Sequence, residues 1–208
     1  MMHWFTFMLA VWMKIFFLFT PFFALSMYLS LTHGYTAGQR HRLLLQIAFA
    51  LSVVCLVLFF FGNVLFAVFG MTVDAFRAGA GGLLFLSAVG MVQRTPQQQL
   101  AQGDNEDIAV VPLAVPVIAG PATIGALLVL GAEAHATAEQ VAGCAALLLA
   151  IVAVVGVLLA GTYIERILGK RGINILSRLT GLVLAALAAQ MLLLGVRNSL
   201  GLGQTAGP

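Results

Sequence analysis

Charged side chains are scarce in this sequence: Asp, Glu, Lys and Arg together make up only 8% of its 208 residues. A soluble domain carries about 25% charged residues, because its surface must be solvated by water. Hydrophobic residues instead make up 62% of the chain, and the mean hydropathy is +1.06. This composition excludes an ordinary soluble domain. It predicts an integral membrane protein whose main partner is the lipid bilayer.

Cysteine is nearly absent as well. Cys55 and Cys144 both fall within apolar stretches, without a CxxC motif or metal-ligand spacing. We expect both to be small buried hydrophobic residues. The four histidines do not pair with Asp, Glu or Cys at ligand spacing; they are His3, His33, His41 and His135. The sequence therefore predicts no metal site and no other cofactor.

Two further classes of function find little support. The apolar stretches contain no paired carboxylates and no nucleophile with a neighbouring base, so we expect no enzyme. Lys and Arg number 10 against 7 Asp and Glu, and the pI is about 9.2. These basic residues gather at the ends of apolar stretches, and no basic stripe with interleaved aromatic residues is present. We therefore expect no binding of nucleic acid.

The apolar residues form six stretches, each of at least the roughly 18 residues that a helix needs to cross a bilayer. The stretches are residues 4–31, 43–69, 75–92, 108–131, 141–159 and 179–196. They predict an all-α integral membrane protein with six transmembrane helices. The predicted organisation is a first three-span unit (1–92), a polar loop (93–107), a second three-span unit (108–198) and a tail (199–208).

The first stretch resembles a retained span more than a cleaved signal peptide. It has no basic segment ahead of it, Lys14 lies within it, and no small-x-small cleavage motif follows.

The loop charges predict the orientation. The loops after the first, third and fifth spans contain Arg40, Arg42, Arg94, Arg166, Lys170 and Arg171. The opposite loops contain Arg77 and Arg197, together with Glu133 and Glu139. Because cytoplasmic loops carry an excess of Lys and Arg, we expect both termini to lie on the periplasmic side.

The two halves resemble each other at an offset of about one hundred residues. The matches include proline steps within apolar stretches, capping-box patterns at helix starts, and glycines at span ends. The matched pairs are Thr20-Pro21 with Gly120-Pro121, Thr36…Gln39 with Thr137…Gln140, and Phe69-Gly70 with Leu168-Gly169. Their common order and offset indicate an internal duplication.

Each half contains three spans, which is an odd number. The second half must therefore enter the membrane from the side opposite to the first. This predicts two inverted three-helix repeats, related by a pseudo-two-fold axis in the membrane plane, as in many secondary transporters. Alternating access would be the natural consequence.

Both repeats are expected to contain a broken helix, in spans one and four. A proline within a span removes a main-chain donor, and the freed groups need partners other than lipid. A helix that restarts at such a proline exposes unpaired N–H groups and a partial positive charge, which suit a carboxylate. The alternative interpretation is that both prolines only kink their helices. We expect the Thr123 hydroxyl to stay free for a ligand. The candidate substrate-binding residues are Thr20, Pro21, Phe22, Ser26, Gly120, Pro121, Ala122 and Thr123.

Several motifs resemble one known family. The segment 111–125, VPLAVPVIAGPATIG, resembles the signature of the MarC family of six-span inner-membrane proteins. Residues 169–173 and 177–181 resemble the start of that family's sixth span, and residues 80–83 its third. The resemblance extends from the first span to about Val196. One departure lies in the first repeat, where relatives have Asn-Pro and this chain has Thr20-Pro21 followed by two phenylalanines.

The resemblance implies a bacterial inner-membrane protein with a transport role. Some members of the family are classed as transporters of small neutral amino acids. The expected function is therefore secondary transport of a small zwitterionic solute, with its carboxylate on the helix turns after Pro21 and Pro121. The alternative is a structural or accessory membrane protein of the same family that does not transport. A homo-oligomer is compatible with either function.

Overall fold

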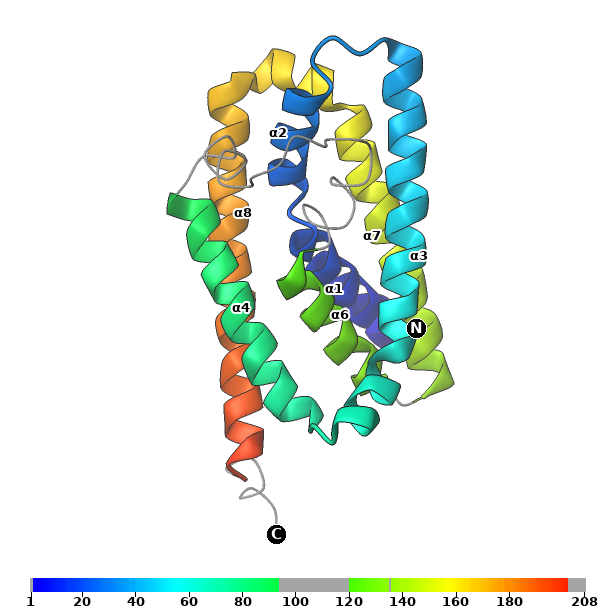
Figure 1. Ribbon diagram of the computed structural model, residues 1–208, viewed down its shortest axis with the longest axis vertical. Coiled ribbons are helices and arrows are strands. Elements are labelled where there is room, and N and C mark those ends of the chain that lie inside the picture. The colour runs from blue at the N-terminus through cyan, green and yellow to red at the C-terminus, as the bar shows by residue number, and fades with distance from the viewer. Residues whose placement is uncertain (1, 94–119, 135, 202–208) are drawn as a thin grey trace.

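The computed structural model describes residues 2–93, 120–134 and 136–201, and for residues 2–7, 121 and 122 it describes the main chain alone. The described residues form seven helices and no strand (Figure 1). The prediction of an all-α fold is therefore confirmed for this part of the chain. The predicted polar loop, apart from Gln93, and residues 108–119 of the predicted fourth span lie outside the described residues.

The first predicted span consists of two helices, α1 (Met2–Leu18) and α2 (Pro21–Leu31). The helix is interrupted at the Thr20-Pro21 step, as the proline predicts. In the orientation of Figure 1, α1 rises from the lower half of the bundle to its middle, and α2 continues to the upper end. We use upper and lower in this sense throughout.

Helix α3 (Ala37–Phe69) follows and is 33 residues long. Its length of about 50 Å, at 1.5 Å per residue, exceeds a hydrocarbon core about 30 Å thick. Its start has the predicted capping box: the Thr36 hydroxyl accepts from the Gln39 N–H, and Gln39 Oε1 accepts from the Thr36 N–H at 2.9 Å. The helix ends at Gly70, whose φ of 63° is the left-handed conformation that glycine adopts at helix ends. Helix α4 (Val73–Gln93) then returns to the upper part.

The second half contains α6 (Pro121–Glu133), α7 (Thr137–Leu159) and α8 (Gly161–Ser199). Helix α6 descends from the middle to the lower end, α7 rises, and α8 descends again (Figure 1). The capping box predicted at Thr137 and Gln140 is wrong by one residue. The residue before the helix is Ala136, whose N–H donates to Glu139 Oε2 at 3.3 Å.

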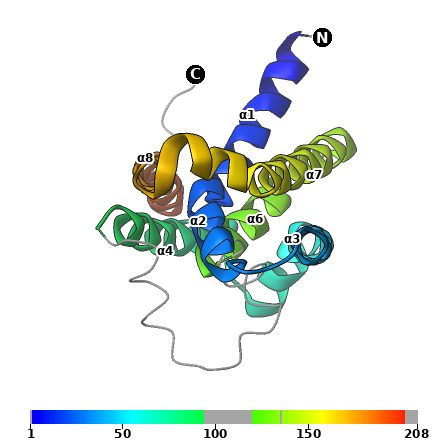
Figure 2. The same ribbon diagram turned by 90° about the horizontal axis from the view of Figure 1, so that it is seen from above.

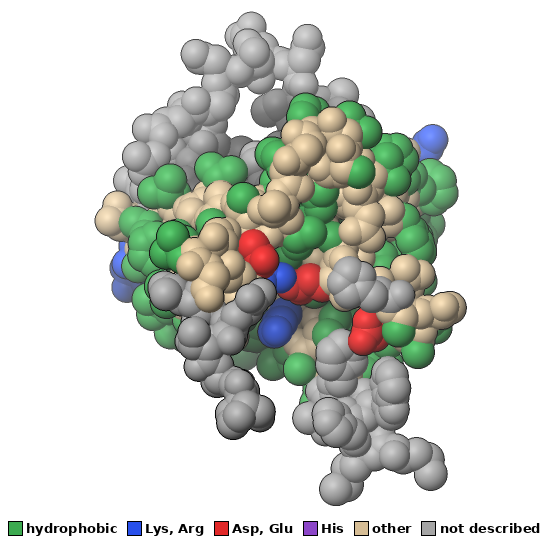
Figure 3. Space-filling model, turned by 90° about the horizontal axis from the view of Figure 1, so that it is seen from below, with side chains coloured by type: hydrophobic (Ala, Val, Ile, Leu, Met, Phe, Trp, Pro, Cys, Tyr) green, Lys and Arg blue, Asp and Glu red, His purple; other side chains and the backbone are tan. Residues whose placement is uncertain are grey.

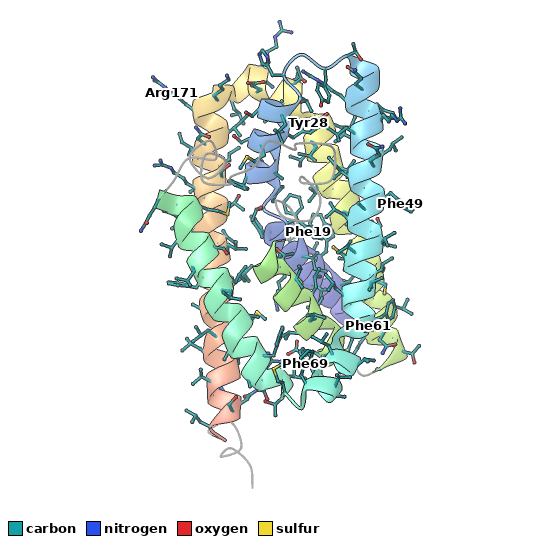
Figure 4. All side chains as sticks on the ribbon, in the orientation of Figure 1. Phe19, Tyr28, Phe49, Phe61, Phe69 and Arg171 are labelled. Carbon is teal, nitrogen blue, oxygen red and sulfur yellow. The ribbon has the colours of Figure 1, made fainter. Side chains whose placement is uncertain are left out.

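The predicted loop before the sixth span is also wrong, because most of it is helical. Helix α8 begins at Gly161 and is interrupted only at Gly169, where φ is 64°. The hydropathy pattern located the most apolar part of this helix. It missed the preceding turns, where Arg166, Lys170 and Arg171 are exposed. Arg171 lies at the upper end in Figure 4.

Among the described residues, five helical stretches are long and apolar enough to cross a membrane. They are Met8–Leu31, Ala37–Phe69, Val73–Gln93, Thr137–Leu159 and Gly161–Ser199. A sixth apolar helix, Thr123–Glu133, is shorter. Large apolar side chains cover the outer surface: Phe49 is 73% exposed and points away from the bundle, whereas Phe19 is fully buried near its centre (Figure 4). This outward apolar surface is what a lipid-facing protein requires.

Helices α2 and α6 occupy the centre of the bundle, with α3, α4, α7 and α8 around them (Figure 2). Helix α6 packs against α3 and α4, while α2 packs against α7 and α8. Helices α4 and α8 lie close together because small residues line their contact. A Cβ atom built on Gly81 would come within 2.6 Å of the Leu192 nitrogen, and one on Gly195 within 2.6 Å of the Ala78 nitrogen. Such small-residue contacts are typical of helix packing in membranes.

Candidate functional site

The first helix break lies between α1 and α2. The Phe19 and Thr20 N–H groups still donate to the carbonyls of Ile15 and Phe17, which completes the last turn of α1. Pro21 then occupies the first position of α2, where its missing N–H costs no hydrogen bond. The break is therefore a defined change of direction with a new helix start after it.

Thr20 makes this change of direction in an unfavourable conformation. Its φ of 46° and ψ of 58° are left-handed, and among the described non-glycine residues Thr20 alone has a positive φ. A β-branched residue is strained there, whereas Asn is several-fold enriched in this region. Asn-Pro, which the family resemblance implies at this step, would fit the backbone with less strain. The Thr20 side chain is buried, and it makes no capping hydrogen bond to α2.

The second predicted break falls at the start of α6, and the residues before Gly120 lie outside the described part of the chain. Gly120 is extended, with φ of −67° and ψ of 170°, and Pro121 takes the first helical position. The Gly120 carbonyl accepts the first intrahelical bond, from the Ile124 N–H at 3.0 Å. Pro21 and Pro121 thus both take the first position of a helix, although the preceding residue is left-handed at Thr20 and extended at Gly120.

The two breaks contact each other through Thr123. Its hydroxyl, in the first turn of α6, donates to the main-chain carbonyl of Leu18 at 3.1 Å. Thr123 is only 5% exposed. The hydroxyl is therefore not free for a ligand, as the sequence suggested, but satisfies a carbonyl that the break in α1 left without a helical partner.

The helices that start at the two breaks run in opposite directions. Helix α2 leads upward and α6 leads downward, and both begin near mid-height (Figure 1). Their first turns leave N–H groups without intrahelical partners and give each start a partial positive charge. The middle of the bundle therefore has two helix N-termini and the C-terminal end of α1 together.

The predicted site residues are partly brought together. Thr20, Pro21 and Thr123 are buried at the breaks, and Phe22 and Gly120 are half-buried. Pro121 and Ala122 form the first turn of α6, but their side chains lie outside the described part. Ser26 lies one turn further along α2 and lines a cavity.

This upper cavity has a volume of about 330 Å³ and lies between α2 and α8. Its lining is mainly polar. The lining residues are Ser26, Leu29, Ser30, His33, Arg40, Thr162, Glu165, Lys170, Ile173 and Asn174.

A lower cavity of about 130 Å³ approaches the breaks from the other end, and its lining is mainly apolar. Its lining residues are Lys14, Leu18, Arg77, Leu84, Ala126, Val129, Leu130, Glu133, Leu187, Gln190, Met191 and Leu194.

Arg77 is held by two carboxylates beside the lower cavity. It pairs with Asp74 at 2.9 Å and with Glu133 at the end of α6. The Asn198 side-chain amide donates to the same Asp74 oxygen at 3.1 Å. These contacts join α4, α6 and α8 where the lower face gathers acidic and basic side chains near its middle (Figure 3).

The sequence did not predict either cavity. The lining positions nevertheless correspond at the repeat offset of one hundred, although the residue types differ: the pairs are Ser26/Ala126, Leu29/Val129 and Ser30/Leu130 in α2 and α6, and His33/Glu133 at their ends. The remaining lining residues come from distant segments that only the tertiary fold brings together. Across the described residues, no three His, Cys, Asp or Glu side chains cluster as metal ligands.

Comparisons with known proteins agree along nearly the whole chain. Residues 5–200 match the family described as "MarC family integral membrane protein". A UPF0056 membrane protein of Methanocaldococcus jannaschii is 32% identical over 194 residues, covering 90% of this chain and 94% of its own. The UPF0056 membrane protein YvbG of Bacillus subtilis is 29% identical, with coverage of 93% and 96%. YhcE of Escherichia coli, another UPF0056 membrane protein, is 27% identical, with coverage of 88% and 89%. No solved structure matches.

Proposed function

Because the chain belongs to the MarC family of integral membrane proteins, we propose that it is a secondary transporter of small neutral amino acids or similar zwitterionic solutes. The solute carboxylate binds at the first turns of α2 and α6, and main-chain carbonyls at the breaks accept from its ammonium group. The observation that carries this proposal is the Thr123–Leu18 hydrogen bond, which holds the proline-started helix α6 against the end of α1, just before the proline that starts α2.

We also propose that the chain is an inverted repeat, and the offsets between its helix starts support this. Helices α2 and α6 start after Thr20 and Gly120, and α3 and α7 start after Thr36 and Ala136, an offset of 100 in both cases. The left-handed glycines that follow, Gly70 and Gly169, differ by 99. Because α2 and α6 run in opposite directions, these equivalent segments have opposite orientations (Figure 1). Opposed repeats around broken helices are the architecture of many secondary transporters.

The two cavities also support alternating access. Equivalent faces of α2 and α6 line them, and they approach the breaks from opposite ends. A solute at the breaks would then have one route to each side of the membrane. We place the upper end in the cytoplasm, since Arg40, Arg42, Arg166, Lys170 and Arg171 lie there. Both termini are then periplasmic.

The chemistry at the breaks favours binding over catalysis. Helix N-termini and free carbonyls hold opposite charges without forming a covalent intermediate. A formal charge buried in the same place would cost on the order of 3 kcal/mol. We therefore propose that the protein is not an enzyme and moves its solute unchanged.

The test is exchange of radiolabelled alanine or glycine in proteoliposomes that contain the purified chain. We expect exchange in the unmodified protein and a strong loss in Pro121→Ala, because a continuous helix no longer presents a free N-terminus. Thr123→Val should lower exchange as well, because the link between the breaks is lost. Thr180→Val is the matched control, since the Thr180 hydroxyl bonds only to Leu176 of its own helix.

Absence of exchange for every neutral amino acid would refute the proposal and favour an accessory role without transport. Full exchange in both Pro121→Ala and Thr123→Val would instead show that the solute binds elsewhere.

A further inference from the structure

The upper cavity has the features of a binding site in its own right. Its volume of about 330 Å³ falls within the range of about 300–1,000 Å³ that is usual for small-molecule sites. Ser26 and Ser30 line one side at helical spacing along α2, and His33 joins them from the turn that follows this helix. Lys170 and Asn174 line the other side at the same spacing along α8. Two polar helix faces therefore oppose each other across this space.

Arg40 is fixed in position at this cavity. Its Nη1 donates to Thr162 Oγ1 at 3.1 Å, and its Nη2 donates to the Thr32 carbonyl at 3.1 Å. Its Nε is buried and has no partner. Buried donors without a partner are rare in folded proteins, and each calls for an explanation. An oxygen acceptor in the cavity would supply the missing partner.

The charge of Arg40 is likewise uncompensated within the described residues, where no carboxylate lies at ion-pair distance from it. Arg77 at the lower cavity is different, because Asp74 and Glu133 both pair with it. The arginine at the lower cavity is thus occupied by the protein's own carboxylates. The arginine at the upper cavity is available to a carboxylate from outside.

A second unsatisfied polar atom lies one helical turn beyond the lining of this cavity. The Ser177 hydroxyl is buried without a partner, and the residue is 2% exposed. Ser177 lies one turn below Ile173, which lines the cavity, and on the same face of α8. In the described chain, Arg40 Nε and Ser177 Oγ are the two buried side-chain polar atoms without partners.

We propose that the upper cavity is an entry site that binds the carboxylate of a small amino acid through Arg40. Lys170 adds positive charge for the carboxylate, and Glu165 on the same lining receives the ammonium group. This proposal rests on the proposed function, since a solute held here is one step from the helix breaks. Ser177 is the next hydrogen-bonding group that it meets as it moves inward.

The test is protection of a cysteine in the cavity from a water-soluble maleimide. Cys55 and Cys144 are replaced by alanine, and Asn174→Cys provides the reporter. We expect alanine to slow labelling severalfold. Acetate, which has the carboxylate alone, should protect more weakly, and ethylamine, which lacks it, should not protect.

Arg40→Gln should raise the alanine concentration that gives half-protection by about tenfold or more, the equivalent of about 1.4 kcal/mol. Arg42→Gln is the matched control, because Arg42 is an exposed arginine on the same helix outside the cavity lining. Lys170→Gln provides a second variant at an exposed position, where misfolding does not explain a loss of protection. Its half-protection concentration should also rise.

Three outcomes would overturn the proposal: no protection by alanine, equal protection by ethylamine, or unchanged protection in Arg40→Gln and Lys170→Gln. These results are separable from failure of transport. Arg40-dependent protection without exchange would retain the entry site and refute the transporter. Alanine exchange without protection of the reporter cysteine would retain the transporter and refute the entry site.

Discussion

The Thr123 hydroxyl donates to the Leu18 carbonyl at 3.1 Å and so joins the first turn of α6 to the last turn of α1. The two residues are 105 positions apart and come from the two halves of the chain. Both groups are buried, so neither finds water as an alternative partner. The two helix breaks are therefore one structural unit, and a change at one alters the other.

Thr123→Val tests this unit through stability. The substitution keeps the side-chain shape but leaves the Leu18 carbonyl without a donor, so we expect the free energy of unfolding to fall by about 1–3 kcal/mol. Thr123→Ser keeps the hydroxyl and should lose less. The measurement is the thermal unfolding midpoint in detergent. Equal losses for valine and serine would show that the methyl group, and not the hydrogen bond, is the important contact.

Thr20→Asn should stabilise the protein. Thr20 has a left-handed backbone, which costs an L-residue roughly 1–2 kcal/mol, and Asn accepts that conformation more readily. We expect a gain of about 0.5–1 kcal/mol. Thr20→Val is the comparison variant, because it retains the β-branch and the strain. A midpoint that does not rise in Thr20→Asn would contradict the left-handed assignment.

The interruption before Pro21 and the helix start at Pro121 were predictable because their cause is local. Pro21 and Pro121 cannot continue a helix, whatever surrounds them. The capping box at Thr36 is equally local and was predicted. At α7 the prediction was wrong by one residue: the helix starts after Ala136, whose N–H donates to Glu139 and which has no side-chain acceptor for the reciprocal bond.

The upper cavity was not predictable in the same way. Arg40 and Thr162, which meet beside it, are 122 residues apart. The left-handed conformation of Thr20 could not be predicted for another reason. Asn and Gly are the residues that usually adopt this conformation, so a β-branched Thr gives no sign of it in the sequence.

Two glycines of α4 should respond in opposite ways to the same substitution. A Cβ on Gly81 would come within 2.6 Å of the Leu192 nitrogen, and main-chain atoms of a packed helix cannot easily move aside. Gly81→Ala should therefore destabilise the protein by about 1–3 kcal/mol. Gly79 has open space around its Cβ position, so Gly79→Ala should stabilise by about 0.5–1 kcal/mol. Similar midpoints for both variants would refute the close α4–α8 contact.

Ser177→Ala separates a ligand-binding role from a structural one. The Ser177 hydroxyl is buried without a partner, so its removal costs no hydrogen bond and should raise the free energy of unfolding by about 1 kcal/mol. Alanine exchange should nevertheless fall, if the hydroxyl serves the solute. Thr180→Ala is the contrasting variant, because it breaks the bond to Leu176 and should destabilise. A Ser177→Ala variant that is less stable would indicate a protein partner for this hydroxyl.

The Arg77–Glu133 ion pair should act as a closure of the lower cavity. It links α4 to the end of α6, and the proposed alternating access would require α6 to separate from its neighbours at this end. Glu133 is partly exposed, so the ion pair contributes about 1 kcal/mol. Its loss should shift the ratio of closed to open lower cavity roughly fivefold.

Glu133→Gln should therefore speed maleimide labelling of Leu187→Cys, in the lining of the same cavity, by about fivefold. The control exchanges the two charges: Arg77→Glu combined with Glu133→Arg should restore slow labelling, although Asp74 then faces a like charge and limits the recovery. Labelling that stays slow in Glu133→Gln would show that helix packing alone, without the ion pair, keeps the lower cavity closed.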